Sequence, residues 1–168
     1  MKIGTHLFLF KTILYKQTTK KHTLDKKVLL VQTDTTVGFL SQNHEALSSL
    51  KERKIEKPFV TVTASFKHLK TISRVPNAHK KRVRRAKEST FIYANNRAIR
   101  VINDEKHKAF IKPFVWMYST SANEKGLCYD KEFAFGKSDI IVEDFRGLFE
   151  GESSSIYRLY QDKLQRLR

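Results

Sequence analysis

The chain has 168 residues, of which 40% are apolar, so it has enough material for one domain with a substantial core and too little for a second. Its 33 lysines and arginines outnumber its 17 acidic residues and give a net charge of +16, which favours an anionic partner: nucleic acid, nucleotide phosphates or an acidic membrane surface. The single cysteine excludes an internal disulfide framework and favours a reducing cytoplasm, and no apolar run is long enough to span a membrane.

Residues 1–27 are predicted to form a basic N-terminal extension, because they carry seven lysines against the single acid Asp25. Apolar residues at 7, 10, 13 and 14 recur at helical spacing, although a strand fits the same stretch.

The rest of the chain is predicted to alternate short strands with short helices, since β-branched runs and helical periodicity follow one another. In chain order we expect a strand at 28–31, a helix at 41–53, a strand at 59–63, a helix at 66–72, strands at 89–93 and 97–102, a helix at 105–110, a strand at 115–118, a small helix within 126–135 and a strand at 140–142. Ser41 or Asn43 is expected to cap the first helix. Residues 161–168 are predicted to be a basic C-terminal tail. The pattern predicts an α/β fold.

Three stretches rich in hydroxyl groups are predicted to be loops after strands. They are residues 32–38, 119–123 and 151–157. Loops in this position of open α/β sheets bind ligands, whereas a polar turn that caps a helix is the simpler interpretation. Lys51 and Arg53 at a helix end and Arg100 in an apolar strand are expected to join these loops in one cationic pocket. Each of the three is also compatible with a solvent-facing cation.

Five motifs lie in these strands and loops: QTDTTVGF at 32–39, KERKIEKPF at 51–59, AIRV at 98–101, STSANEKG at 119–126 and SSSI at 153–156. In this order they resemble the YrdC-type threonylcarbamoyl-adenylate synthase domain. The STSAN loop together with a Lys-x-Arg and a following Lys-Pro is fairly specific, whereas each motif alone is weak. The resemblance covers residues 28–159 and places the domain at 28–160. It implies a twisted mixed β-sheet with flanking helices and a positively charged cleft.

The resemblance also implies an enzyme. Members of this family combine L-threonine, bicarbonate and ATP into threonylcarbamoyl-AMP, which serves the modification of adenosine 37 in tRNA. By matching positions, the catalytic residues are Lys51 and Arg53, the ATP-binding residues are Lys51, Arg53, Ser119, Ser121 and Asn123, the threonine and carbamate side has Thr33, Thr35 and Arg100, and Ser154 and Ser155 match a late hydroxyl pair in part. The implied cofactors are ATP and Mg²⁺, with no metal ligand from protein side chains. The implied partners are L-threonine, bicarbonate, tRNA or another RNA, and the transferase subunits of the pathway.

That chemistry accounts for the residue types. Attack of a carbamate on the α-phosphate brings two anions together, so the site must neutralise charge and hold the reactants in line. An arginine fork, a lysine charge and Mg²⁺ would do so without a protein nucleophile.

The chain departs from the family pattern at three places. Gln32 stands where the family usually has proline, Val37 stands where it usually has an aromatic residue, and the basic residues 83–91 replace a Trp-Pro-Gly segment that lines the cleft. The alternative function is therefore a non-catalytic RNA-binding module on the same fold. Its cations would be Lys80, Lys81, Arg82, Arg84 and Arg85, unless this run is merely a solvated face. A third interpretation replaces threonine with carbamoyl phosphate.

Overall fold

A computed structural model describes residue 24, residues 26–52 and residues 58–168. Its strands are β1 (Leu29–Gln32), β2 (Val37–Ser41), β3 (Val60–Thr63), β4 (Ser89–Ile92), β5 (Ala98–Val101), β6 (Trp116–Ser121), β7 (Ile140–Val142), β8 (Ser155–Leu159) and β9 (Leu164–Arg166). Its α-helices are α2 (His44–Leu50), α3 (Phe66–Ile72), α4 (Lys80–Arg85), α5 (Glu105–Ile111) and α6 (Lys131–Lys137). Short 3-10 helices span Asn77–His79 and Lys112–Phe114.

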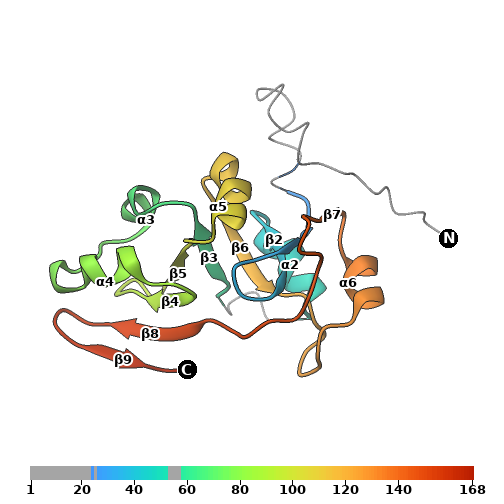
Figure 1. Cartoon of the computed structure of the whole chain (residues 1–168). Coiled ribbons are helices and arrows are strands. Elements are labelled where there is room, and N and C mark those ends of the chain that lie inside the picture. Colours follow the sequence, from blue (N-terminus) through green and yellow to red (C-terminus); the bar gives the residue numbers. More distant parts are fainter. Residues whose placement is uncertain (1–23, 25, 53–57) are drawn as a thin grey trace.

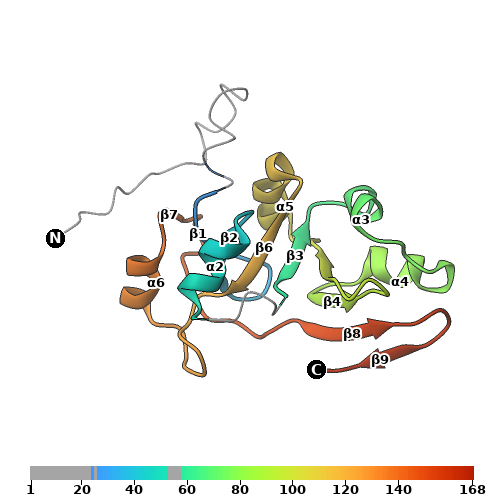
Figure 2. The same cartoon turned by 180° about the vertical axis from the view of Figure 1, so that it is seen from behind.

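All nine described strands belong to one sheet, in the order β7-β1-β2-β6-β3-β5-β4-β8-β9 (Figure 1). The pairs β1–β7, β3–β5 and β4–β8 are parallel, and the other neighbours are antiparallel. The view from behind shows the same twisted sheet with its helices alongside (Figure 2). The predicted twisted mixed sheet with flanking helices is therefore confirmed, and its positively charged cleft stays a prediction.

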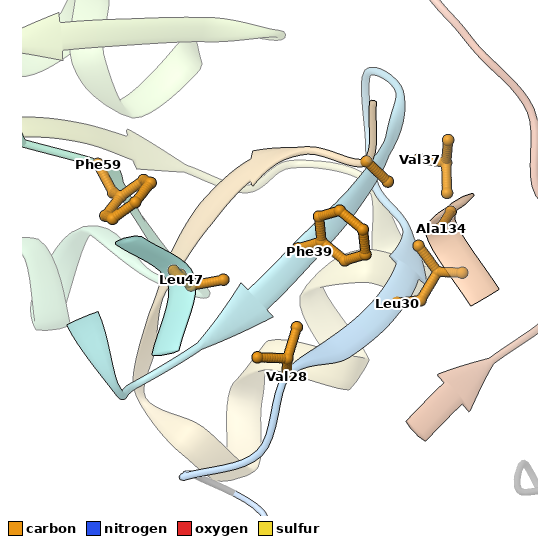
Figure 3. Close-up of a cluster of buried hydrophobic side chains, with 8 residues drawn as sticks. Val28, Leu30, Val37, Phe39, Leu47, Phe59 and Ala134 are labelled. Atoms are coloured by element: carbon orange, nitrogen blue, oxygen red, sulfur yellow. The ribbon is translucent and has the colours of Figure 1, made fainter. Parts of the chain in front are cut away.

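Side chains of the central strands alternate between two cores. Leu30 and Phe39 pack with Leu47 of α2 and Ala134 of α6 (Figure 3). Their neighbours in the strands point the other way, where Leu29, Val31 and Leu40 pack with Ile111 of α5. A third cluster forms where Leu69 of α3 and Val83 of α4 cover β4, β5 and β8. Because burying each large apolar side chain contributes about 1.5–3 kcal/mol, these clusters fix the helices on the sheet.

Two predicted helices show how side-chain caps set their limits. The helix predicted at 66–72 is α3, and Ser65 caps it by accepting a hydrogen bond from the backbone N–H of His68. The helix predicted at 41–53 is shorter, because α2 starts after Asn43, whose side chain accepts from the N–H of Ala46. Ser41, the other candidate cap, is the last residue of β2.

Backbone pairing corrects all three loop predictions. Val37 and Gly38, expected in a loop, begin β2, which forms a hairpin with β1. Residues 119–121, also expected in a loop, belong to β6, because β6 pairs with β2 on one side and β3 on the other. Ser155, expected in a turn after a strand, begins β8 and pairs with β4.

The two ends of the predicted domain differ in how far they can be described. Of the extension at 1–27, only residues 24, 26 and 27 are described. Within residues 161–168, predicted as a basic tail, β9 pairs antiparallel with β8. In the described ranges, no helix is long and apolar enough to cross a membrane.

Candidate functional site

The turn between β1 and β2 is held by the hydroxyl of Thr33. That hydroxyl donates to the carbonyl oxygen of Thr36 at 2.6 Å and accepts from the backbone N–H of Thr35 at 3.2 Å. It also lies 3.1 Å from the Thr35 hydroxyl. Because Thr33 is buried and fully engaged within the turn, its hydroxyl shapes the loop, and Thr35 is the residue that reaches across to β5.

Arg100 of β5 lies buried against this turn. Its Nη1 donates to the Thr35 hydroxyl at 3.0 Å, and its Nη2 lies 3.3 Å from Oδ1 of Asp34. Both charged side chains of this ion pair are 5% exposed. The Nε–H of Arg100 is also buried and has no hydrogen-bond partner among the described residues. An unpaired donor on a buried guanidinium is costly.

His107 of α5 contacts Asp34 from the other side. Its Nδ1 lies 3.2 Å from the same oxygen, Oδ1, and 3.2 Å from the backbone nitrogen of Asp34. Burial acts to raise the pKa of Asp34, but the hydrogen bond from His107 and the charge of Arg100 outweigh it and leave that pKa lowered. Burial lowers the pKa of His107, and the bond to Asp34 offsets this only in part. The three side chains therefore form one buried, electrostatically coupled cluster.

Lys51, directly after α2, reaches the STSAN segment. Its ammonium contacts the carbonyl oxygen of Ser121 at 3.3 Å, the side-chain oxygen of Asn123 at 3.2 Å, and the carbonyl oxygen of Asn123. The hydroxyl of Ser121 donates to the same Asn123 side-chain oxygen at 2.6 Å. Three predicted ATP-binding residues are thus in direct contact. A fourth, Ser119, is 8% exposed and lies two residues earlier in β6.

The QTDTTVGF motif and the STSAN segment lie side by side because β2 lies between β1 and β6 in the sheet. Gly38 makes this approach feasible, since a Cβ at this position would lie 2.9 Å from the carbonyl oxygen of Thr120. The N–H of Ala122 donates to the carbonyl of Val37 at 3.0 Å and continues the pairing past the end of β6. The threonine-rich turn and the STSAN segment therefore meet at one end of this strand pair.

A late segment closes over the turn. The N–H of Phe149 donates to the side-chain oxygen of Gln32 at 2.9 Å, and the N–H of Gly151 donates to the Thr36 hydroxyl at 3.2 Å. Gly151 passes so near the turn that a Cβ would lie 2.1 Å from the carbonyl oxygen of Thr35. Gln32, which replaces the usual proline of the resembled motif, thus supplies an acceptor that proline lacks.

The late hydroxyl pair divides into two different environments. Ser154 is buried, and its hydroxyl lies 3.0 Å from that of Thr90 in β4. Its carbonyl accepts from Nε and Nη2 of Arg168 at 3.2 and 3.0 Å. The backbone N–H of Ser155 donates to the carbonyl of Glu88 at 3.0 Å, which is a strand-edge contact.

The structure therefore brings predicted site residues together in two groups. One group combines Thr33, Thr35 and Arg100, and a second combines Lys51, Ser121 and Asn123, with Ser119 in the same strand. Arg53 lies outside the described residues. The predicted RNA-binding cations form the exposed face of α4, which lies at the opposite end of the sheet from α6 (Figures 1 and 2).

Sequence reasoning missed Asp34, His107 and Thr90. Asp34 sits inside the QTDTTVGF motif, and a carboxylate between two threonines after a buried strand was a usable signal. His107 lies 73 residues away and gives no local signal, because only folding brings α5 against the turn. Among the described residues, no group of three or more His, Cys, Asp or Glu side chains is placed to hold a metal ion.

Comparison with known proteins identifies the fold. No protein-family model and no curated protein sequence matches the chain. Among solved structures, E. coli YciO is similar with a TM-score of 0.69 and 17% identity, over 85% of this chain and 82% of that one. P. abyssi Sua5, solved in complex with L-threonine, has a TM-score of 0.68 and 18% identity, and a full-length HypF, solved in a phosphate- and nucleotide-bound form, has 0.67 and 15%; each comparison covers 86% of this chain.

The coverage is unequal for the larger proteins. The chain spans 50% of the Sua5 chain and 27% of the HypF chain, so it corresponds to a part of each. At these identities the likeness defines architecture and not activity. The chain therefore has the YrdC-like fold.

Proposed function

We propose that the chain catalyses the ATP-dependent formation of threonylcarbamoyl-AMP from L-threonine and bicarbonate. The observation that carries the proposal is that Arg100 contacts the threonine-rich turn and Lys51 contacts the STSAN segment, two stretches that the pairing of β2 with β6 brings to one end of the sheet. The complex of Sua5 with L-threonine, on the same fold, supports threonine as the amino-acid substrate.

The Arg100 side suits the anionic end of the amino acid. A buried guanidinium with an unpaired Nε–H can donate to a carboxylate or carbamate, and low dielectric strengthens that contact. Thr35 already orients Nη1 through its hydroxyl. This side of the site would therefore hold the carbamate in position to attack.

The Lys51 side suits the nucleotide. Its ammonium is bound to three oxygen atoms of Ser121 and Asn123, and phosphate oxygens would compete for the same donor. Mg²⁺ bound to the triphosphate would supply further charge neutralisation there. The carbamate would form a bond to the α-phosphate as the bond to pyrophosphate breaks. Arg53, outside the described residues, remains a predicted catalytic partner on the basis of its motif.

The test is pyrophosphate release from Mg-ATP, with and without L-threonine and bicarbonate. We expect release only when both are present. Lys51→Met should lower turnover by roughly 10²- to 10³-fold, the scale for loss of one preorganised donor. The matched control is Lys67→Met, which removes an exposed lysine of α3 and should leave turnover unchanged.

A further pair of reactions compares carbamoyl phosphate with L-threonine and bicarbonate as the substrate. If carbamoyl phosphate supports release and threonine with bicarbonate does not, the site belongs to the carbamoyl-transferring alternative. Pyrophosphate release in the absence of both substrate sets would contradict a synthetase of either type, because adenylation requires its acceptor to be bound.

A second candidate function is RNA binding through α4. All five of its predicted cations are exposed, while Val83 alone anchors the helix in the core. Arg84 also lies over the ring of Phe66, with its guanidinium carbon 4.5 Å from the centroid. A row of exposed cations suits the phosphate backbone of RNA. This function is compatible with catalysis elsewhere and would replace it if pyrophosphate release fails.

A further inference from the structure

We propose that His107 is a positioning residue whose protonation sets how firmly Asp34 holds Arg100, so that an anion arriving at Arg100 is bound together with a proton on His107. The inference deepens the proposed function, because L-threonine, through its carboxylate, is the anion used to test it. It starts from geometry: one carboxylate oxygen of Asp34 faces both the guanidinium of Arg100, at 3.3 Å, and Nδ1 of His107, at 3.2 Å.

The contacts of Nδ1 cannot all be made in one protonation state. When Nδ1 carries no proton, its lone pair accepts the backbone N–H of Asp34 at 3.2 Å but faces the lone pairs of Oδ1. When Nδ1 carries a proton, it donates to Oδ1, and the backbone N–H loses its acceptor. A proton placed on Nδ1 therefore exchanges one hydrogen bond of Asp34 for another, and this changes the charge of the cluster only when Nε2 keeps its proton as well, so that the ring is an imidazolium.

Protonation of His107 to the imidazolium changes the net charge of the cluster that His107 forms with Asp34 and Arg100. With neutral His107, the charges of Asp34 and Arg100 cancel within a buried pair. With protonated His107, one carboxylate is shared by two cations, and the cluster carries a net positive charge. A buried net charge is unfavourable by itself but becomes favourable once an anion enters. The unpaired Nε–H of Arg100 is a donor for that anion.

His107 is buried beside a small cavity. Its side chain is 0% exposed, and its Nε2 has no partner among the described residues. A cavity of about 10 Å³ is lined by His107 together with Gln32, Lys106, Asp144 and Arg146, which is room for about one water.

Of the other charged groups that line this cavity, Lys106 lies over the ring of Phe145, and Asp144 and Arg146 form an ion pair. Arg146 binds Asp144 at 2.6 Å and also approaches Asp104 at 3.4 Å. Asp104 acts to raise the pKa of His107, and Arg100 acts to lower it, but burial is the largest influence and leaves it lowered. An anion bound at Arg100 would cancel the influence of Arg100, so the pKa of His107 would rise on binding.

The first experiment is calorimetric titration of the full chain with L-threonine in buffers of different ionisation heat, between about pH 5 and 6.5, where histidine titrates. We expect net proton uptake on binding and tighter binding at lower pH, by up to about tenfold per pH unit for one proton. His107→Asn keeps a side-chain acceptor for the Asp34 N–H but cannot be protonated, so both effects should disappear. His68→Asn, the same change in α3, should behave like the parent protein.

The second experiment follows the imidazole signals by NMR in the ligand-free protein. Arg100→Met removes the neighbouring positive charge and should raise the pKa of His107. An unchanged pKa would overturn the proposal, as would threonine binding without proton uptake in the parent protein. If threonine gives no heat in any buffer while Arg100→Met still shifts His107, the threonine site fails and the coupling of His107 to Arg100 stands.

Discussion

The buried pair of Asp34 and Arg100 gives the sharpest prediction about stability. Asp34→Asn keeps the shape of the side chain but leaves the buried guanidinium of Arg100 without its carboxylate. Breaking a buried pair in this way costs about 3–5 kcal/mol. In a chain of this size each kcal/mol corresponds to about 2–4 °C, so the midpoint of thermal unfolding should fall by about 6–20 °C.

The assay is thermal and urea unfolding at neutral pH, followed by circular dichroism. Glu105→Gln is the control, because it neutralises an equally charged group in the exposed pair with Lys108, where little stability is at stake. Combining Asp34→Asn with Arg100→Met should recover most of the loss, since no buried charge is then left unpaired. A single Asp34→Asn variant that melts within about 2 °C of the parent would refute the reasoning.

Four other outcomes follow from the same structure. Millimolar Mg-ATP should raise the melting temperature, because a ligand that binds only the folded state stabilises it, and no shift would count against the nucleotide site. Neutralising all five α4 cations should weaken tRNA binding and flatten its dependence on salt by about 0.9 logarithmic units per lost phosphate contact, whereas an unchanged slope would mark α4 as a solvated face. Gly151→Ala should destabilise the fold by about 1–3 kcal/mol in urea unfolding, because its Cβ would overlap the backbone at Thr35. Because burial lowers the pKa of His107, the unfolded chain binds more protons than the folded chain below pH 6.5, so the free energy of unfolding should fall there, and below 3.8 the lowered pKa of Asp34 should decrease it further; in urea titrations His107→Asn should remove the first decrease and reduce the second, because the hydrogen bond from His107 helps to lower the pKa of Asp34.

Local signals were sufficient for much of the architecture. The helical pattern at 66–72 predicts α3 with its observed limits, and Asn43 was a candidate cap for α2. Short β-branched runs predict most of the strands because their side chains must enter the cores on both faces. These elements depend on residues close together in the chain, which is the information that a pattern carries.

Elements defined by pairing were not predictable in the same way. Val37 and Gly38 follow four polar residues and carry a glycine, so they resemble a loop until β1 and β6 pair with them on both sides. β9 lies in a basic stretch without a strand pattern and is a strand because it pairs with β8. The site behaves likewise: its motifs identified Arg100 and Lys51, but Asp34 and His107 become partners only through contacts 73 residues apart.

The long connection from β7 to β8 has a consequence for synthesis on the ribosome. It leaves the sheet beside β1 and rejoins it beside β4, and on the way Phe149 and Gly151 bind the β1–β2 turn across more than 100 residues of chain (Figure 1). A nascent chain that has emerged only as far as β6 contains Asp34, Arg100 and His107 but lacks the late segment, with Phe149 and Gly151, that closes over the turn. The site therefore matures late in translation, and a chain released early would display its motifs without their final geometry.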